Sequence, residues 1–368
     1  MSSNISEIQS FAAEQFQYDL IEWFEYHQRD LPWRKDQDPY KVWVSEIMLQ
    51  QTRVDTVIPY YKRFMSLFPT ASDLAKAEEE TVLKAWEGLG YYSRARNLHQ
   101  AVKEVDEKYG GVVPDSKDGV HSLKGVGPYT AGAILSIAYD IPTPAVDGNV
   151  MRVLSRIFTI YDDISKPATR KKFEAIVEEI ISKNNPSYFN QGLMELGALV
   201  CTPMSPSCLL CPVQAHCKAR DEGVQQLLPV KAKKKPPKSK NMKAVIIEDA
   251  DGNVLIERRP ETGLLAKLWQ FPNIEASTEQ NEDLQSYIEN LNVEGNMIGP
   301  VQHVKHVFSH IVWEIDVYTV QADTIINRDF YDDEGEIRFV PKDEIHWYPF
   351  PVSHQKIMKE QVMKSVHS

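Results

Sequence analysis

The sequence has little cysteine, no long apolar run and no leader-like start. Its 368 residues contain only four cysteines, and all four lie between positions 201 and 217. No run of about 18 apolar residues occurs, so we expect no membrane span. The first residues, MSSNISEIQSFAAEQF, lack a basic segment followed by an apolar one, so we expect no secretory signal. These absences predict a soluble cytoplasmic protein that does not associate with a membrane.

The acidity of the chain is unevenly distributed. The formal net charge is −11, which at first argues against a nucleic-acid partner. Residues 1–240 carry 30 Lys and Arg against 30 Asp and Glu, whereas residues 241–368 carry 11 against 22. The whole acidic excess therefore lies in the last third of the chain. Because a phosphate-binding face can lie on the neutral first part, the net charge does not exclude DNA.

The pattern of apolar residues changes along the chain and divides it into domains. From Phe11 to about Cys217, apolar residues recur at helical spacing between short turns with Pro or Gly. KAKKKPPKSK then has six lysines and two prolines, which indicates a solvated basic linker. Beyond it, KAVIIEDADGNVLIERRP predicts a β-hairpin, VKHVFSHIVWEIDVYTV predicts further strand, and QNEDLQSYIENL predicts a helix. We expect a helical domain at 1–230, a linker at 231–241 and a mixed α+β domain at 242–368.

The four cysteines have the spacing C-x6-C-x2-C-x5-C, at Cys201, Cys208, Cys211 and Cys217. Thiolates this close together can surround one metal centre, and disulfides are rare in cytoplasmic proteins. Zinc sites more often have two C-x2-C pairs set apart by a longer loop, whereas one compact, unevenly spaced loop favours a [4Fe–4S] cluster. Zinc and four unrelated buried cysteines stay open as alternatives. His216, inside this loop, is interpreted as a surface residue.

A glycine-rich turn stands before a predicted helix in LKGVGPYTAG. The turn comprises Lys124, Gly125, Val126 and Gly127, and the helix begins at Pro128 or Tyr129. Amides at such a helix start can bind a phosphate. Because a short helix, DGVHSL, precedes the turn, the unit is typical of a helix–hairpin–helix that holds the DNA backbone. A plain helix–helix turn is the alternative.

Two carboxylates stand out by their surroundings. Asp147, in AVDGNVMRVLSR, lies where a helix N-cap is expected, and a capping carboxylate near DNA is also a fixed negative charge. Glu46 lies among apolar residues in YKVWVSEIMLQQTRV. It is therefore either paired in the core or held in a partly dry pocket with a raised pKa. The polar residues that follow, Gln50, Gln51 and Thr52, suit contacts with base edges.

Taken together, the glycine hairpin, Asp147 and the cysteine spacing resemble the endonuclease III superfamily of DNA glycosylases. Within it, SEIMLQQT, GLGYYSRARNL and LKGVGPYTAG resemble the MutY-type adenine glycosylases. The similarity covers nearly the whole chain, including GLLAKLWQFPN in the second domain, although Lys124 stands where many such hairpins have proline. The resemblance implies an all-helical helix–hairpin–helix glycosylase domain with an iron–sulfur cluster loop, followed by a Nudix-like α+β domain.

The resemblance also implies a reaction. Such enzymes act as monomers on double-stranded DNA and excise adenine mispaired with 8-oxoguanine or guanine, which leaves an abasic site. It implies that Glu46 is the general acid at adenine N7 and that Asp147 stabilises the oxocarbenium-like sugar, with Tyr129 and Asn149 beside it. The lyase branch has a lysine where Tyr129 stands, and a tyrosine cannot form a Schiff base. We therefore expect a monofunctional glycosylase.

Further residues are implied to contact the bases. An enzyme that flips a base out of the duplex is expected to insert side chains, here called wedges, into the duplex beside it. Nudix hydrolases hold magnesium with an R-E-x-x-E-E helix, which the second domain lacks, so we expect it to recognise 8-oxoguanine without hydrolysis. The wedges implied are Gln51 and Tyr91, with Thr52 and Leu89 beside them; the adenine pocket is Arg29, Trp33, Arg34 and Gln191; and the lesion-contacting loop is Phe308, Ser309 and His310.

Two other functions remain as alternatives. One is an endonuclease III-like glycosylase/lyase for oxidised pyrimidines, against which Tyr129 and the second domain argue. The other is a non-catalytic DNA-binding protein with a zinc-stabilised loop. In each case DNA is the expected partner, and we expect the protein to be associated with the nucleoid.

Overall fold

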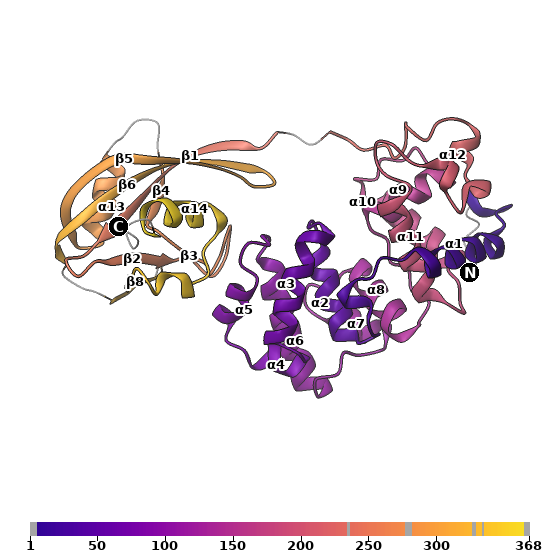
Figure 1. Cartoon of the computed structure of the whole chain (residues 1–368), viewed down its shortest axis with the longest axis horizontal. Coiled ribbons are helices and arrows are strands. Elements are labelled where there is room, and N and C mark those ends of the chain that lie inside the picture. Colours follow the sequence, from indigo (N-terminus) through magenta and orange to yellow (C-terminus); the bar gives the residue numbers. More distant parts are fainter. Residues whose placement is uncertain (1–5, 234–235, 277–281, 326–328, 333–334, 364–368) are drawn as a thin grey trace. The chain divides into compact units, whose positions relative to one another are not determined.

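The computed structural model describes the chain except for residues 1–5, 234–235, 277–281, 326–328, 333–334 and 364–368, and these described residues form two compact units (Figure 1). The helical unit comprises residues 1–76 and 97–233. The sheet unit comprises residues 77–96 and 234–368. Residues 77–96, a short segment of the N-terminal half, are therefore part of the sheet unit, because they contact mainly the C-terminal part of the chain.

The helical unit confirms the predicted all-helical first domain. Its secondary structure includes short 3-10 turns at Ser6–Ile8, Pro32–Arg34, Cys208–Leu210 and Gln214–His216. Its helices are α1 (Ala13–His27), α2 (Pro39–Leu49), α3 (Val54–Leu67), α4 (Ala71–Lys76), α6 (Ser93–Tyr109, which begins in the sheet unit), α7 (Lys117–Ser122), α8 (Pro128–Tyr139), α9 (Gly148–Ile157), α10 (Pro167–Ile180), α11 (Pro186–Leu199) and α12 (Lys218–Asp221).

Local sequence determines where the helices near the expected site begin. Proline occupies the first turn of α2 and α8, where the missing N–H leaves no hydrogen bond unmade. The Asp38 side chain caps α2 by accepting from the backbone N–H groups of Tyr40 and Lys41. The short α7, the glycine turn and α8 follow one another as the predicted helix–hairpin–helix.

Close packing of α8 positions the chain that leads to Asp147. A Cβ added at Gly132, in the middle of α8, would lie 1.8 Å from the carbonyl oxygen of Pro144. Glycine therefore allows this backbone segment to lie directly against α8. Apolar residues of α1, α9 and α11, including Leu20, Leu154 and Leu193, form a buried core of the unit.

The sheet unit confirms the predicted mixed α+β second domain. The sheet order is β5-β6-β1-β2-β8-β7, with β3 beside β2 and β4 beside β1; β1 runs parallel to β6, and the other pairs are antiparallel. Its elements are α5 (Glu79–Ala85), β1 (Lys238–Glu248), β2 (Asn253–Arg258), β3 (Trp269–Gln270), β4 (Asn273–Glu275), α13 (Glu282–Asn290), β5 (Val293–Val307), β6 (Ile311–Ile325), β7 (Asp329–Asp332), β8 (Gly335–Pro341), a 3-10 turn at Ile345–Trp347 and α14 (Val352–Gln361).

Both faces of this sheet are covered, which explains the unbroken apolar run in β1. Alternate residues of β1 enter two different cores. Ala244 and Ile246 pack with Ile357 of α14, whereas Val245 and Ile247 pack with the α13 side. The hairpin between β1 and β2 is confirmed, but β1 already begins at Lys238, inside the interval 231–241 that the sequence predicts as a linker.

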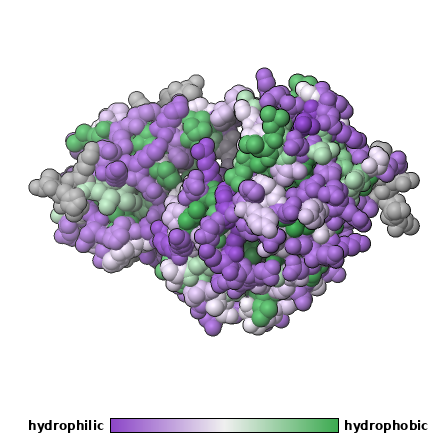
Figure 2. Space-filling view, turned by 45° about the vertical axis from the view of Figure 1, so that its right-hand side comes forward, coloured by the Kyte–Doolittle hydropathy of each residue, from purple (hydrophilic) through white to green (hydrophobic). Residues whose placement is uncertain are grey.

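In the described part of the chain, no helix combines the length and the apolar character needed to cross a bilayer. The face drawn in Figure 2 is mostly hydrophilic, with hydrophobic residues in several small groups.

The contact at Gly132 leads to a stability prediction. Gly132→Ala places a methyl group against the Pro144 carbonyl, so it should lower the free energy of unfolding by roughly 2 kcal/mol or more. Gly148→Ala is the matched control, because a Cβ there meets nothing within 4 Å. Chemical denaturation of the two variants and the wild type measures the difference. Equal stability of all three would contradict the close packing of α8.

Candidate active site

Glu46 is buried within the helical unit. It stands on α2, in which most side chains from Tyr40 to Met48 are buried, and only 6% of its own surface is exposed. One of its carboxyl oxygens, Oε2, accepts a hydrogen bond from the Tyr129 hydroxyl. Burial raises the pKa of Glu46 to about 7; the Tyr129 hydrogen bond lowers it, and the charge of Asp147 raises it further. Glu46 is therefore partly protonated at neutral pH.

Asp147 caps α9, as the sequence predicts. Its Oδ1 accepts from the backbone N–H of Val150 at 2.7 Å, and its Oδ2 accepts from the Asn149 amide at 2.9 Å. Burial raises the pKa of Asp147, while the hydrogen bonds from Val150 and Asn149 act in the opposite direction. The cap thus holds a carboxylate in one orientation at the start of a helix, where a negative charge is favoured.

Tyr129 lies in the first turn of α8 and contacts both the acid and the neighbouring core. Its hydroxyl donates to Glu46 and lies 3.7 Å from the sulfur of Met194. Burial raises the pKa of Tyr129 well above its ordinary value, with further increases from Glu46 and Asp147. Tyr129 is therefore a neutral hydrogen-bond donor and has no amine with which to attack a sugar.

Arg152 connects this site to the cysteine loop. It lies on α9 one turn after Asn149, and its Nη2 donates to the Asn149 Oδ1 at 2.8 Å and to the Gly197 carbonyl at 2.7 Å. Its Nε donates to the carbonyl of Cys201 at 2.8 Å. A Cβ on Gly197 would lie 2.7 Å from the Cβ of Asn149, so glycine is needed for this close approach. The orientation of Asn149 therefore depends on the loop that carries the cysteines.

The four cysteines line one cavity together with Arg156. Arg156 is 2% exposed; its Nη1 lies 3.2 Å from the Cys201 sulfur and also donates to the Thr202 carbonyl, and its Nε donates to the Leu228 carbonyl. Within the described residues, no three His, Cys, Asp or Glu side chains form a site for a single metal ion. Four thiols around a shared cavity are the ligand set of a [4Fe–4S] cluster, so the residues fit that group.

His216 is not the surface residue that the sequence suggests. Its Nε2 lies 2.8 Å from Oδ2 of Asp19 on α1, and its side chain is 9% exposed. Its ring packs edge-on against Phe11 and Phe16. The prediction is wrong because residues of α1, about 200 positions earlier in the chain, cover His216.

The residues predicted for the adenine pocket gather around a glutamate that the sequence analysis missed. Glu195 of α11 is 1% exposed, and its carboxylate accepts from the guanidinium groups of Arg29 and Arg34. Burial acts to raise the pKa of Glu195, but these hydrogen bonds outweigh it and lower the pKa to about 2. Arg34 also donates to Gln191 at 3.1 Å, whereas Trp33 packs edge-on against Tyr61. The signal for Glu195 is the same as for Glu46, namely a carboxylate in an apolar helix.

The predicted DNA-contacting turns have distinctive backbones. Gln51 follows α2 with a positive φ of 62°, and Tyr91 has a φ of 48°. In the hairpin, Gly125 has a φ of 75° and Gly127 caps α8. Lys124, before the first glycine, is exposed, and Val126, between the two glycines, is buried. Thr52 donates to the Gln50 carbonyl at 3.4 Å, and Leu89 is buried.

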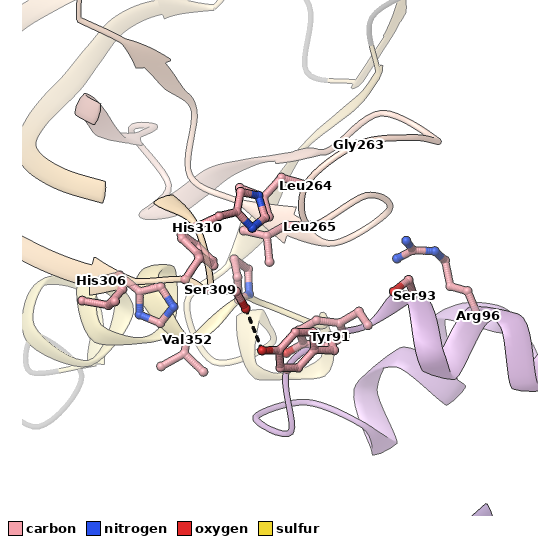
Figure 3. Close-up of a pocket in the computed structure, with 15 residues that line it drawn as sticks. Tyr91, Ser93, Arg96, Gly263, Leu264, Leu265, His306, Ser309, His310 and Val352 are labelled. Carbon is pink, nitrogen blue, oxygen red and sulfur yellow. Dashed lines mark hydrogen bonds between the residues drawn. The ribbon is translucent and has the colours of Figure 1, made fainter. Parts of the chain in front are cut away.

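The Phe308–His310 loop joins β5 to β6 and lines a pocket in the sheet unit (Figure 3). The hydroxyls of Tyr91 and Ser309 lie 2.6 Å apart at one side of this pocket. Phe308 packs edge-on against Trp313, while Ser309 and His310 are exposed. The structure therefore brings one predicted wedge and the predicted lesion loop together.

Comparisons with known proteins define the class. Residues 44–179 match the HhH-GPD superfamily of base excision DNA repair proteins, and residues 243–360 match the NUDIX domain. A solved thermostable thymine-DNA glycosylase is similar with a TM-score of 0.51 and 27% identity, over 57% of this chain and 97% of that chain. The chain thus has a helix–hairpin–helix base excision repair fold followed by a Nudix-like domain.

Relatives narrow the class to a family. The adenine DNA glycosylase of Rattus norvegicus is 37% identical, over 83% of this chain and 70% of its own length. That of Schizosaccharomyces pombe is 35% identical, over 86% and 84%, and that of Buchnera aphidicola subsp. Schizaphis graminum is 37% identical, over 80% and 84%. The chain belongs to the adenine DNA glycosylases. The predicted family, fold class and enzyme type are confirmed, DNA is the partner, and the lyase and non-catalytic alternatives are not favoured.

The raised pKa of Glu46 leads to a prediction about stability. The folded state holds the Glu46 proton more tightly than the unfolded state, so its contribution is fully present below the ordinary pKa of 4.5 and is lost as pH rises through about 7. Above that pH the folded protein bears the cost of ionising a buried carboxyl group, and Glu46→Gln removes this cost. It should unfold less readily than wild type at pH 8, by up to roughly 3 kcal/mol, and show little difference near pH 4.

Denaturant unfolding across this pH range measures the effect. Glu195→Gln is the control of opposite sign, because the lowered pKa of Glu195 stabilises the fold at neutral pH and that contribution is lost as pH falls toward 2. A wild type and a Glu46→Gln variant that stay parallel from pH 4 to pH 8 would mean that Glu46 is not held in a dry environment.

Proposed function

We propose that this protein removes adenine paired with 8-oxoguanine, or with guanine, by hydrolysing the N-glycosidic bond and leaving an abasic site. The observation that carries the proposal is the pair of carboxylates in unequal environments, Glu46 in a dry pocket with a pKa of about 7 and Asp147 fixed as a helix cap. Glycosidic cleavage generally needs one carboxyl group protonated and the other ionised. On this proposal the enzyme works in the cytoplasm, on the nucleoid.

Glu46 acts as the general acid. Because Tyr129 donates to Oε2, the Glu46 proton resides on the other oxygen and is available to adenine N7. Protonation at N7 lets adenine leave as a neutral base. With a pKa of about 7, a substantial fraction of Glu46 carries this proton at neutral pH, and the resulting carboxylate can then accept a proton from water.

Asp147 stabilises the positive charge that develops on the sugar. Hydrogen bonds from Val150 and Asn149 hold its carboxylate in place before the reaction, so no reorganisation is needed when charge develops. Arg152 holds Asn149 in turn. Because Tyr129 offers no amine, water adds to the sugar carbon that adenine leaves, and the strand stays intact.

The remaining predicted residues recognise the DNA. Arg29 and Arg34, clamped by Glu195, form with Trp33 and Gln191 the pocket for the flipped adenine. The Lys124–Gly127 hairpin holds a phosphate, and Gln51 enters the duplex with Thr52 and Leu89 nearby. This part of the proposal rests on the exposed, positive-φ conformation of Gln51 and on the glycine turn before α8.

The Tyr91–Ser309 pair reads the lesion. 8-Oxoguanine differs from guanine by a hydrogen on N7 and an oxygen on C8, and a serine hydroxyl can pair with either. The hydrogen bond to Tyr91 restricts rotation of the Ser309 hydroxyl. Phe308 and His310 complete the loop on either side, so the pocket in Figure 3 is the site that we assign to 8-oxoguanine.

Cys201, Cys208, Cys211 and Cys217 hold a [4Fe–4S] cluster on this proposal. When bound, the cluster supplies a cross-link between the end of α11 and the segment before α12. The residues around it keep the loop folded toward α9, since Arg156 and Arg152 donate to its carbonyl oxygens.

The function is tested with a duplex that contains one adenine:8-oxoguanine pair, run on a denaturing gel with and without alkali. We expect strand breakage only after alkali, because base removal leaves an abasic site and Tyr129 cannot cleave the strand. Glu46→Gln and Asp147→Asn should each lower the single-turnover rate by at least roughly 100-fold. Rates within tenfold of wild type would remove that residue from the mechanism, and breakage without alkali would contradict the assignment of Tyr129.

The cluster is tested by iron and acid-labile sulfide analysis of the purified protein together with its visible absorption. We expect four irons and four sulfides for each chain and broad visible absorption, and Cys211→Ser should lower both contents. Zinc in place of iron, with no visible absorption, would show that the cysteines hold a different centre.

A further inference from the structure

Tyr91, one half of the Tyr91–Ser309 pair, has an unfavourable backbone conformation. Its φ of 48° lies in the left-handed region, which disfavours a residue with a Cβ. Nearly half of its surface, 49%, is exposed, so burial alone does not hold the ring. Figure 3 shows Tyr91 projecting from the segment before α6 toward the Phe308–His310 loop. Something must fix this side chain if its hydroxyl is to stay beside Ser309.

Arg94 supplies that restraint from two sides. Its guanidinium carbon lies 5.4 Å from the centre of the Tyr91 ring and 5.4 Å from the centre of the Trp86 ring. A cation that contacts two aromatic rings is attracted to both, and the attraction grows as the cation loses water. Burial lowers the pKa of Arg94 to about 10, so it is desolvated and still charged at neutral pH.

Hydrogen bonds fix the backbone of the same turn. Nη2 of Arg94 donates to the Gly90 carbonyl at 3.1 Å, and the Trp86 indole donates to the same oxygen at 3.2 Å. The backbone N–H of Arg94 donates to the Tyr91 carbonyl at 2.9 Å. Arg94 therefore restrains both the peptide that precedes Tyr91 and the ring itself. All of these groups belong to the sheet unit, as does Ser309.

We infer that Arg94 is a positioning residue for lesion recognition: its contacts with Tyr91, Trp86 and Gly90 hold the Tyr91 hydroxyl against Ser309, and this sets the preference for 8-oxoguanine over guanine. The inference rests on the proposed function, because it acts through the site assigned there to 8-oxoguanine. Arg94 contacts neither base nor sugar in this account. A lysine cannot replace it fully, since its ammonium lacks the planar face that stacks between two rings.

The test measures binding separately from catalysis. Dissociation constants are determined for two duplexes that carry a non-cleavable adenine analogue opposite either 8-oxoguanine or guanine. The constant for the guanine duplex divided by that for the 8-oxoguanine duplex is the binding ratio, and a larger ratio means a stronger preference for 8-oxoguanine. Arg94→Gln should lower this ratio by roughly tenfold, and Arg94→Lys by less. Arg63→Gln is the matched control, because the Arg63 guanidinium makes the same kind of contact, 5.0 Å from the centre of the Tyr60 ring, on α3 of the helical unit, and should leave the ratio unchanged.

A double-mutant cycle separates positioning from general destabilisation. Tyr91→Phe removes the hydroxyl that Arg94 positions, so Arg94→Gln should lower the ratio little further in that background. Arg94→Lys, which keeps the charge on a single donor nitrogen, gives the same comparison if the glutamine variant is poorly folded. A wild-type ratio in either Arg94 variant, or independent losses in the cycle, would overturn the inference. If the wild-type protein shows the expected binding ratios but does not release adenine in the gel assay, that result would contradict the catalytic proposal alone.

Discussion

The burial of the Glu46 carboxyl group against the Tyr129 hydroxyl is the constraint on which the helical unit depends. A carboxylate removed from water is unstable unless it is protonated or paired. Here the helix around it is almost entirely apolar, so α2 must be enclosed on all sides. The Tyr129 hydroxyl, from the first turn of α8, donates to Glu46 and closes that side, while Gly132 lets the Pro144 segment pack against the same helix. The geometry that raises the pKa is therefore the same geometry that forms the core.

A second physical constraint explains why the Asp147 cap and the contacts to the cysteine loop share α9. Asp147 caps the beginning of this helix, while Arg152 and Arg156 extend from it toward the cysteine loop. A buried guanidinium has five N–H groups to satisfy, and helices have few free carbonyl oxygens to accept them. The irregular backbone around Cys201 provides these acceptors. The cysteine loop thus supplies hydrogen-bond acceptors that two buried cations of α9 need, in addition to any metal that it holds.

Features with a local cause could be predicted from the sequence, whereas those that need a distant partner could not. The start of α8 at Pro128, the Asp147 cap and the unusual setting of Glu46 are each specified within a few residues. The clamp around Glu195 joins two arginines to a position more than 160 residues later, and His216 is covered by α1. No local pattern indicates such partners. Likewise, nothing in residues 77–96 shows that they pack with the C-terminal part of the chain.

A left-handed backbone conformation occurs at both residues that the sequence predicts to enter the duplex. Seven non-glycine residues in the described chain have a positive φ, and such conformations persist only where the surrounding structure maintains them. Gln51 and Tyr91 are the two predicted wedges, and Leu265 lines the same pocket as Tyr91. A wedge must project from the surface before DNA arrives, and a left-handed residue turns the chain outward at a single position. The strain at Tyr91 is tolerable because Arg94 and Trp86 hold the turn, so on our proposal the order that recognition needs is present before DNA binds.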